Sequence, residues 1–105
     1  MTLCVCVPAR NEAERLPVLL DALAAQDWPT PVMVSIGINN TTDDSLDVVG
    51  AAQRRHGDRL DIAVVTADFA PELAHAGSAR RLAMDAGLAR IIMAVDGVLI
   101  STDAD

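Results

Sequence analysis

A short, wholly apolar run near the start of the chain limits the possible folds more than any other feature. The run covers residues 3–7, LCVCV, and ends at Pro8. Because no polar residue alternates with the apolar ones, both faces of this segment must be buried, as in a central strand of a parallel sheet. The run therefore predicts an α/β fold with helices on both faces of a sheet.

The rest of the chain alternates further apolar runs with longer amphipathic segments. We expect further strands at residues 32–38, 60–66 and 98–102. We expect three helices: one at residues 14–26, one that follows the 39–44 loop and runs to about residue 56, and one at residues 77–90. Pro17 is tolerated only in a first helical turn, so the first helix should begin near residue 15 or 16. This order predicts right-handed crossovers around a parallel sheet. In such sheets ligands bind beyond the carboxyl ends of the strands, where the polar segments 8–12, 39–44 and 103–105 fall.

The composition argues against several classes of function. The 105 residues include eight Arg, no Lys and fifteen acids, which give a formal net charge of -7. Nucleic-acid binding needs a basic face, and the single Trp and single Phe offer few stacking surfaces. No apolar run approaches the roughly 20 residues of a membrane-spanning helix, and the first residues lack the charged start of a signal peptide. We expect one soluble, cytoplasmic domain with no nucleic-acid partner and no transmembrane segment.

The two cysteines lie two residues apart in the first apolar run. In a strand, Cys4 and Cys6 would point to the same face, near the limit of separation for a disulfide. A metal site built on this pair alone has little support, since no His or further Cys lies nearby in the sequence. We predict two buried thiols.

Two carboxylates follow the last predicted strand. Asp103 and Asp105 project to one side if the extended conformation continues. Two such oxygen ligands suit Mg²⁺ or Mn²⁺, with waters and substrate phosphates completing the coordination. A lone D-x-D motif also describes a solvated chain end, and its place after an apolar strand is what favours a metal site.

Four segments, in order, resemble the N-terminal, nucleotide-binding half of a family 2 glycosyltransferase with the GT-A fold. They are residues 7–12 (VPARNE), 39–45 (NNTTDDS), 76–84 (AGSARRLAM) and 96–105 (DGVLISTDAD). They are similar to the family's P-x-x-N-E opening, its second loop, its G-x-x-x-A/R helix start and its metal-binding D-x-D. The resemblance covers essentially the whole chain, residues 1–105. It implies a partial GT-A fold, a Rossmann-like parallel sheet flanked by helices.

The resemblance implies transfer of a sugar from a nucleotide-diphosphate sugar to an unknown acceptor. The positions that it implies for nucleotide binding are Pro8, Ala9, Arg10, Glu12, Asn39 and Asp103. Asp103 would lie near the ribose and the metal, and Asp105 would ligate the Mg²⁺ or Mn²⁺ that bridges the two phosphates. That cation would stabilise the departing nucleoside diphosphate as a Lewis acid.

The chain departs from the family's pattern in ways that leave parts of the function open. Many relatives have Asp where this chain has Asn39, and Asn can donate as well as accept, so the base is not fixed. Many also have Lys or Arg where this chain has Ala76. In the family the acceptor site and general base follow the D-x-D, so we expect half of a catalytic domain. The last strand would then be an exposed edge through which two copies could pair.

Two other functions stay open: a non-catalytic nucleotide-binding module, and an unrelated doubly wound domain such as a nucleotidyltransferase. A nucleotidyltransferase should have a Gly-rich, basic loop after its first strand, and residues 8–12 contain no Gly. A receiver-like domain should have a late Lys, and this chain has none. Taken singly, Glu12, Asp43 and Asp44 are also typical acids of helix starts, and Thr41 with Asp44 could form a capping box.

Overall fold

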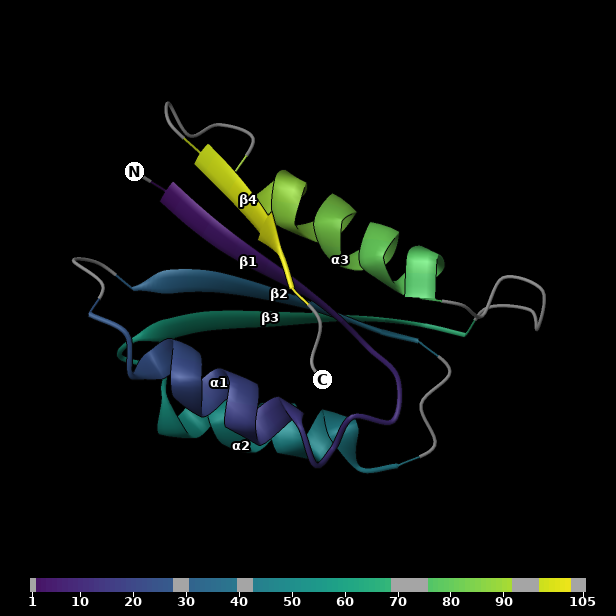
Figure 1. Cartoon of the computed structure of the whole chain (residues 1–105), viewed down its shortest axis with the longest axis horizontal. Coiled ribbons are helices and arrows are strands. Elements are labelled where there is room, and N and C mark those ends of the chain that lie inside the picture. Colours follow the sequence, from purple (N-terminus) through teal and green to yellow (C-terminus); the bar gives the residue numbers. More distant parts are fainter. Residues whose placement is uncertain (1, 28–30, 40–42, 69–75, 92–96, 103–105) are drawn as a thin grey trace.

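The strands form a parallel sheet with helices on both faces. The computed structural model describes residues 2–27, 31–39, 43–68, 76–91 and 97–102. Within these ranges the strand order is β3-β2-β1-β4, and each neighbouring pair is parallel. The elements are β1 (Thr2–Ala9), α1 (Leu16–Ala24), β2 (Val32–Asn39), α2 (Ser45–Arg55), β3 (Leu60–Ala67), α3 (Ala76–Ile91) and β4 (Gly97–Ser101). The predicted Rossmann-like α/β class is confirmed (Figure 1).

Helices α1 and α2 cover one face of the sheet, and α3 covers the other (Figure 1). In β1, Val5 and Val7 belong to the larger core with α1 and α2, whereas Cys4 and Cys6 belong to a smaller core with α3. Successive strand residues thus meet helices on opposite sides. This two-sided burial is why the first run of the sequence carries no polar alternation.

The core beneath α3 is built from small side chains. Cys4 and Cys6 are free and fully buried, and they lie in one cluster with Ala83 of α3. Burial raises the pKa of both thiols, that of Cys6 to about 12. The prediction of two buried thiols is confirmed. Because side chains on both sides are small, α3 lies close to β1 and β2.

The limits of α1 follow from its local sequence. Helix α1 begins at Leu16, which puts Pro17 within the first turn, as predicted. At that position proline removes no helical hydrogen bond, because the first N–H groups of a helix have no partner within it. The helix ends at Ala24, two residues earlier than expected.

Strand β4 lies at one edge of the sheet, next to β1. Val98 pairs with Leu3 and Ile100 with Val5, so both point to the side of the sheet that carries α1 and α2. Their exposed fractions are nevertheless 38% and 45%, since neither of these helices reaches across β4 (Figure 1). None of the helices in the described ranges is long and apolar enough to cross a membrane.

Candidate functional site

The strand order places a topological switch point at β1. From β1 the chain runs to β2 and β3 on one side and then returns to β4 on the other. In open α/β sheets ligands bind beyond the carboxyl ends of the strands at such a point. The chain beyond β4 starts at this edge too, where the N–H of Thr102 donates to the carbonyl of Cys6 (3.0 Å). The edge around the end of β1 is therefore the candidate site.

The loop between β1 and α1, residues 10–15, leaves the sheet through an unusual backbone conformation. Asn11 has a φ of 52°, in the left-handed region that Asn tolerates better than most residues. The carbonyl of Glu12 then accepts the N–H groups of Arg15 (3.1 Å) and Leu16 (2.9 Å), which forms the turn that leads into α1. The side chains of Glu12 and Arg15 meet with 3.4 Å between Oε2 and Nη1.

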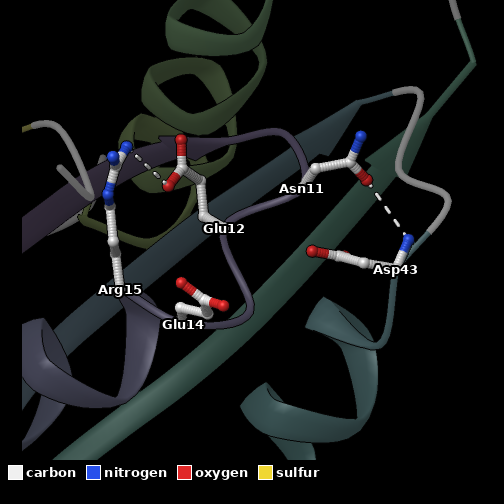
Figure 2. Close-up of a pocket in the computed structure, with 5 residues that line it drawn as sticks. All are labelled: Asn11, Glu12, Glu14, Arg15 and Asp43. Atoms are coloured by element: carbon white, nitrogen blue, oxygen red, sulfur yellow. Dashed lines mark hydrogen bonds and ion pairs between the residues drawn. The ribbon is translucent and has the colours of Figure 1, made fainter.

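A set of hydrogen bonds, here called the loop clasp, joins this loop to the segment that leads into α2. The partners in that segment are Asp43, which lies before α2, and Ser45, its first residue. The clasp consists of Asn11, Glu12, Ala13, Asp43 and Ser45. Asn11 Oδ1 accepts the N–H of Asp43 (3.2 Å), a bond drawn in Figure 2. Asp43 Oδ2 accepts the N–H of Ala13 (3.2 Å), and Ser45 Oγ accepts the N–H of Glu12 (3.1 Å). The clasp fixes the two segments to each other although 30 to 33 residues separate the partners.

Asp43 and Ser45 also bond to each other. The Ser45 hydroxyl donates to Asp43 Oδ1 at 2.6 Å, and the Ser45 N–H donates to the same oxygen at 3.0 Å. The hydroxyl bond is the main cause that lowers the pKa of Asp43. Asp44 occupies the N-cap position of α2 without a side-chain capping bond, so the carboxylate one residue earlier satisfies the first helical N–H. Thr41, the predicted capping-box partner, lies outside the described residues.

A pocket of about 260 Å³ lies against the loop clasp. Its lining residues are Asn11, Glu12, Glu14, Arg15 and Asp43 (Figure 2). Three carboxyl side chains and one guanidinium therefore face a shared space. Carboxylates accept hydrogen bonds from hydroxyl groups and ligate cations, whereas they repel phosphate. The pocket suits a hydroxyl-bearing group.

The structure places four of the predicted nucleotide-binding residues along the end of β1. Pro8 and Ala9 are buried in the last two positions of the strand, and the Ala9 side chain packs in the core with α1 and α2. Ala9 can therefore meet a ligand at this edge only through its backbone. Arg10 follows as an exposed residue, and Glu12 lines the pocket.

The remaining predicted site residues are Asn39, Asp103 and Asp105. Asn39 is the last residue of β2 and pairs with Ala67 of β3; its side chain lies outside what the structure describes. Asp103 and Asp105 also lie outside the described residues. Within the described ranges, no group of three or more His, Cys, Asp or Glu could hold a metal ion. The Mg²⁺ or Mn²⁺ site at the D-x-D motif stays a prediction.

Sequence reasoning missed the structural importance of Asn11 and Ser45. Both belong to the motifs that carry the resemblance, but neither is among the residues predicted to bind the nucleotide. The available signal was an Asn directly before Glu12 and a Ser two places after Asp43. What this signal could not reveal is that these residues bond across two loops.

A second cluster ties α1 to α2 through residues for which the sequence predicts no binding role. Asp21 Oδ1 meets His56 Nε2 at 2.7 Å and accepts from Arg55 Nη2 at 2.8 Å. The contact with His56, and then that with Arg55, lower the pKa of Asp21. The basic end of α2 therefore joins the two helices.

No family model, no curated protein and no solved structure matches this chain. The resemblance to family 2 glycosyltransferases therefore rests on the four sequence motifs.

Proposed function

We propose that this chain binds a nucleotide-diphosphate sugar at the carboxyl edge of β1 and is the donor-binding part of a glycosyltransferase. One observation carries the proposal. The P-x-x-N-E-like loop lies at the topological switch point and is joined there to the second motif loop. Two motifs distant in sequence thus share one pocket, at the place where parallel sheets bind ligands.

The charges of the pocket suggest which part of the donor it takes. Glu12 and Asp43 line it, and their carboxylates can accept hydrogen bonds from the hydroxyls of a ribose. Phosphates need a positive partner, which the resemblance assigns to a divalent cation on Asp103 and Asp105. Such a cation supplies charge neutralisation and stabilises the leaving nucleoside diphosphate. We place the nucleoside in the pocket and the diphosphate toward the end of β4.

The proposal includes an unidentified acceptor, a cytoplasmic location and pairing of two copies through the edge of β4. The last of these has a structural basis. Val98 and Ile100 are partly exposed residues of β4, an edge strand that contains neither proline nor a charged residue. Edge strands of that kind invite pairing with another chain.

A nucleotide panel tests the proposal directly. Thermal unfolding is measured with UDP, GDP, ADP and CDP, each with Mn²⁺ or with EDTA. A ligand at 100 times its Kd adds about 2.7 kcal/mol, which raises Tm by about 10 °C or more in a domain of this size. We expect such a rise with one nucleotide, its loss in EDTA, and its reduction in Glu12→Gln and Asp105→Asn. Asp58→Asn, which removes a charge from the exposed turn before β3, is the matched control.

The outcomes separate the competing functions. If no nucleotide raises Tm in wild type, the proposed site is wrong. If a nucleotide binds and the matching nucleotide sugars are neither hydrolysed nor transferred, the chain acts as a nucleotide-binding module. Binding that survives both Glu12→Gln and Asp105→Asn would contradict the residue assignments.

A further inference from the structure

We infer that Ser45 is a positioning residue of the proposed nucleotide site although its side chain cannot touch a ligand. Ser45 is fully buried at the first position of α2. Its hydroxyl contacts two residues that line the pocket, Glu12 and Asp43. The inference rests on the proposed function, since the residues that Ser45 positions are those proposed to meet the nucleoside.

The Ser45 hydroxyl uses both of its hydrogen-bonding roles on the pocket walls. It donates its proton to Asp43 Oδ1 at 2.6 Å and accepts the N–H of Glu12 at 3.1 Å. A hydroxyl has a single donor, so the Ser45 proton is committed to Asp43. One buried oxygen thus sets the distance between the backbone of the β1–α1 loop and a side chain before α2.

The backbone next to Glu12 needs such support. Asn11 has a positive φ, a conformation that costs energy in residues other than glycine and persists when neighbouring contacts enforce it. Two contacts enforce it here: Asn11 Oδ1 accepts the N–H of Asp43, and the next N–H, that of Glu12, bonds Ser45. Without the Ser45 hydroxyl, the Glu12 N–H loses its partner and the loop can turn the Glu12 carboxylate away from the pocket.

A second buried serine shows that burial alone does not explain Ser45. Ser35 on β2 is equally buried, and its Oγ has no hydrogen-bond partner in the described part of the chain. Ser35 lies in the middle of the sheet on the α3 side, away from the pocket residues. Ser45→Ala and Ser35→Ala each remove one buried hydroxyl, and only Ser45→Ala breaks the loop clasp.

The test measures nucleotide affinity by titration calorimetry, at a temperature where every variant is folded. The titrants are UDP, GDP, ADP and CDP, each with Mn²⁺. We expect Ser45→Ala to weaken the best nucleotide about tenfold, which corresponds to about 1.4 kcal/mol. Ser35→Ala should bind as wild type does, and Ser45→Thr, which keeps the hydroxyl, should restore most of the affinity. Amide hydrogen exchange should show that the nucleotide slows exchange at Glu12 in wild type and not in Ser45→Ala.

A second variant tests the clasp in case Ser45→Ala does not fold. Asp43→Asn keeps an oxygen for Ser45 but turns an NH₂ group toward the N–H of Ala13, so it should also weaken binding several-fold. Asp21→Asn, the same change in the α1–α2 cluster, is its control and should not weaken binding.

The two proposals fail in different ways. Wild-type affinity in both Ser45→Ala and Asp43→Asn would overturn the positioning role and leave the proposed function intact. The positioning role is also overturned if Ser45→Ala does not fold and Asp43→Asn binds normally. If wild type binds none of the four nucleotides, the proposed function fails and the positioning role fails with it.

Discussion

At the scale of single residues, the two fully buried serines have opposite hydrogen-bonding environments. Ser45 bonds the Glu12 N–H and the Asp43 carboxylate, whereas Ser35 Oγ has no partner within the described residues. A buried polar group that loses its partner costs about 1–3 kcal/mol, while removing a group that never had one costs little. The contribution of each serine to stability should therefore differ.

We predict that Ser45→Ala lowers the free energy of unfolding by about 1–3 kcal/mol, because two clasp groups lose a partner. Ser35→Ala should leave it unchanged or raise it slightly, since the variant no longer buries an unsatisfied hydroxyl. Urea unfolding of both variants measures the difference. Equal losses in the two variants would contradict the different bonding of the two hydroxyls.

The lowered pKa of Asp43 predicts how stability depends on pH. The folded state favours the carboxylate form, chiefly because of the Ser45 hydroxyl, so the clasp is fully formed above the unfolded pKa of about 4. Its contribution is lost as the pH falls through the lower, folded pKa. We predict that the Tm difference between wild type and Asp43→Asn is constant above about pH 5 and shrinks below about pH 4. Asp58→Asn controls for the change in net charge, and a difference that does not vary with pH would refute the prediction.

At the scale of elements, the small side chains between α3 and the sheet determine how closely the helix approaches. Ala83 has no exposed surface and packs on Cys4 and Cys6. Arg90, near the end of α3, donates to the carbonyls of Val34 and Asp61 and so holds the helix across β2 and β3. There is little room for a longer side chain at the Ala83 position.

We predict that Ala83→Leu lowers the free energy of unfolding by about 1–3 kcal/mol through overpacking. Ala89→Leu, on the exposed side of the same helix, should change it by no more than about 0.5 kcal/mol. Denaturant unfolding compares the two. A similar cost at both positions would mean that α3 does not depend on this close fit.

The same elements show what the sequence could predict. Apolar runs located the strands, the segments between these runs located the helices, and Pro17 located the start of α1. Those signals are local in the sequence, so they can be read without knowledge of the fold. The left-handed Asn11 and the bonds of Asp43 to Ala13 and of Ser45 to Glu12 were not predicted, because they depend on which loops the sheet brings together. The motif resemblance indicated Glu12 without saying what supports it.

At the scale of the whole molecule, the two edges of the sheet differ. The β3 edge carries Asp61, which pairs with Arg90 at 3.1 Å, and charges discourage edge pairing. Strand β4 itself has no charged residue, and its Val98 and Ile100 are partly exposed. Association of two copies should therefore use β4.

We predict that the chain forms dimers at high concentration and that Ile100→Lys makes it monomeric, because a lysine at an edge opposes strand pairing. Val18→Lys adds the same charge at a residue of α1 that is 69% exposed and should not change the mass. Light scattering over a range of concentrations measures both. A wild-type mass that equals the monomer throughout would exclude pairing.

The position of β1 between β2 and β4 has a consequence for how the chain folds. One neighbour, β2, follows β1 directly in the sequence of strands. The other neighbour, β4, comes after all the other described strands, so the pairing of Thr2 with Gly97 joins residues that are separated by most of the sequence. Pairings between residues so distant form slowly, because a long loop must close before the contact contributes. During synthesis, β1 to β3 can assemble with α1 and α2 while the β4 side of β1 is still open. The nascent chain therefore passes through a stage in which the apolar strand β1 is an uncovered edge of the sheet, when aggregation competes most strongly with folding.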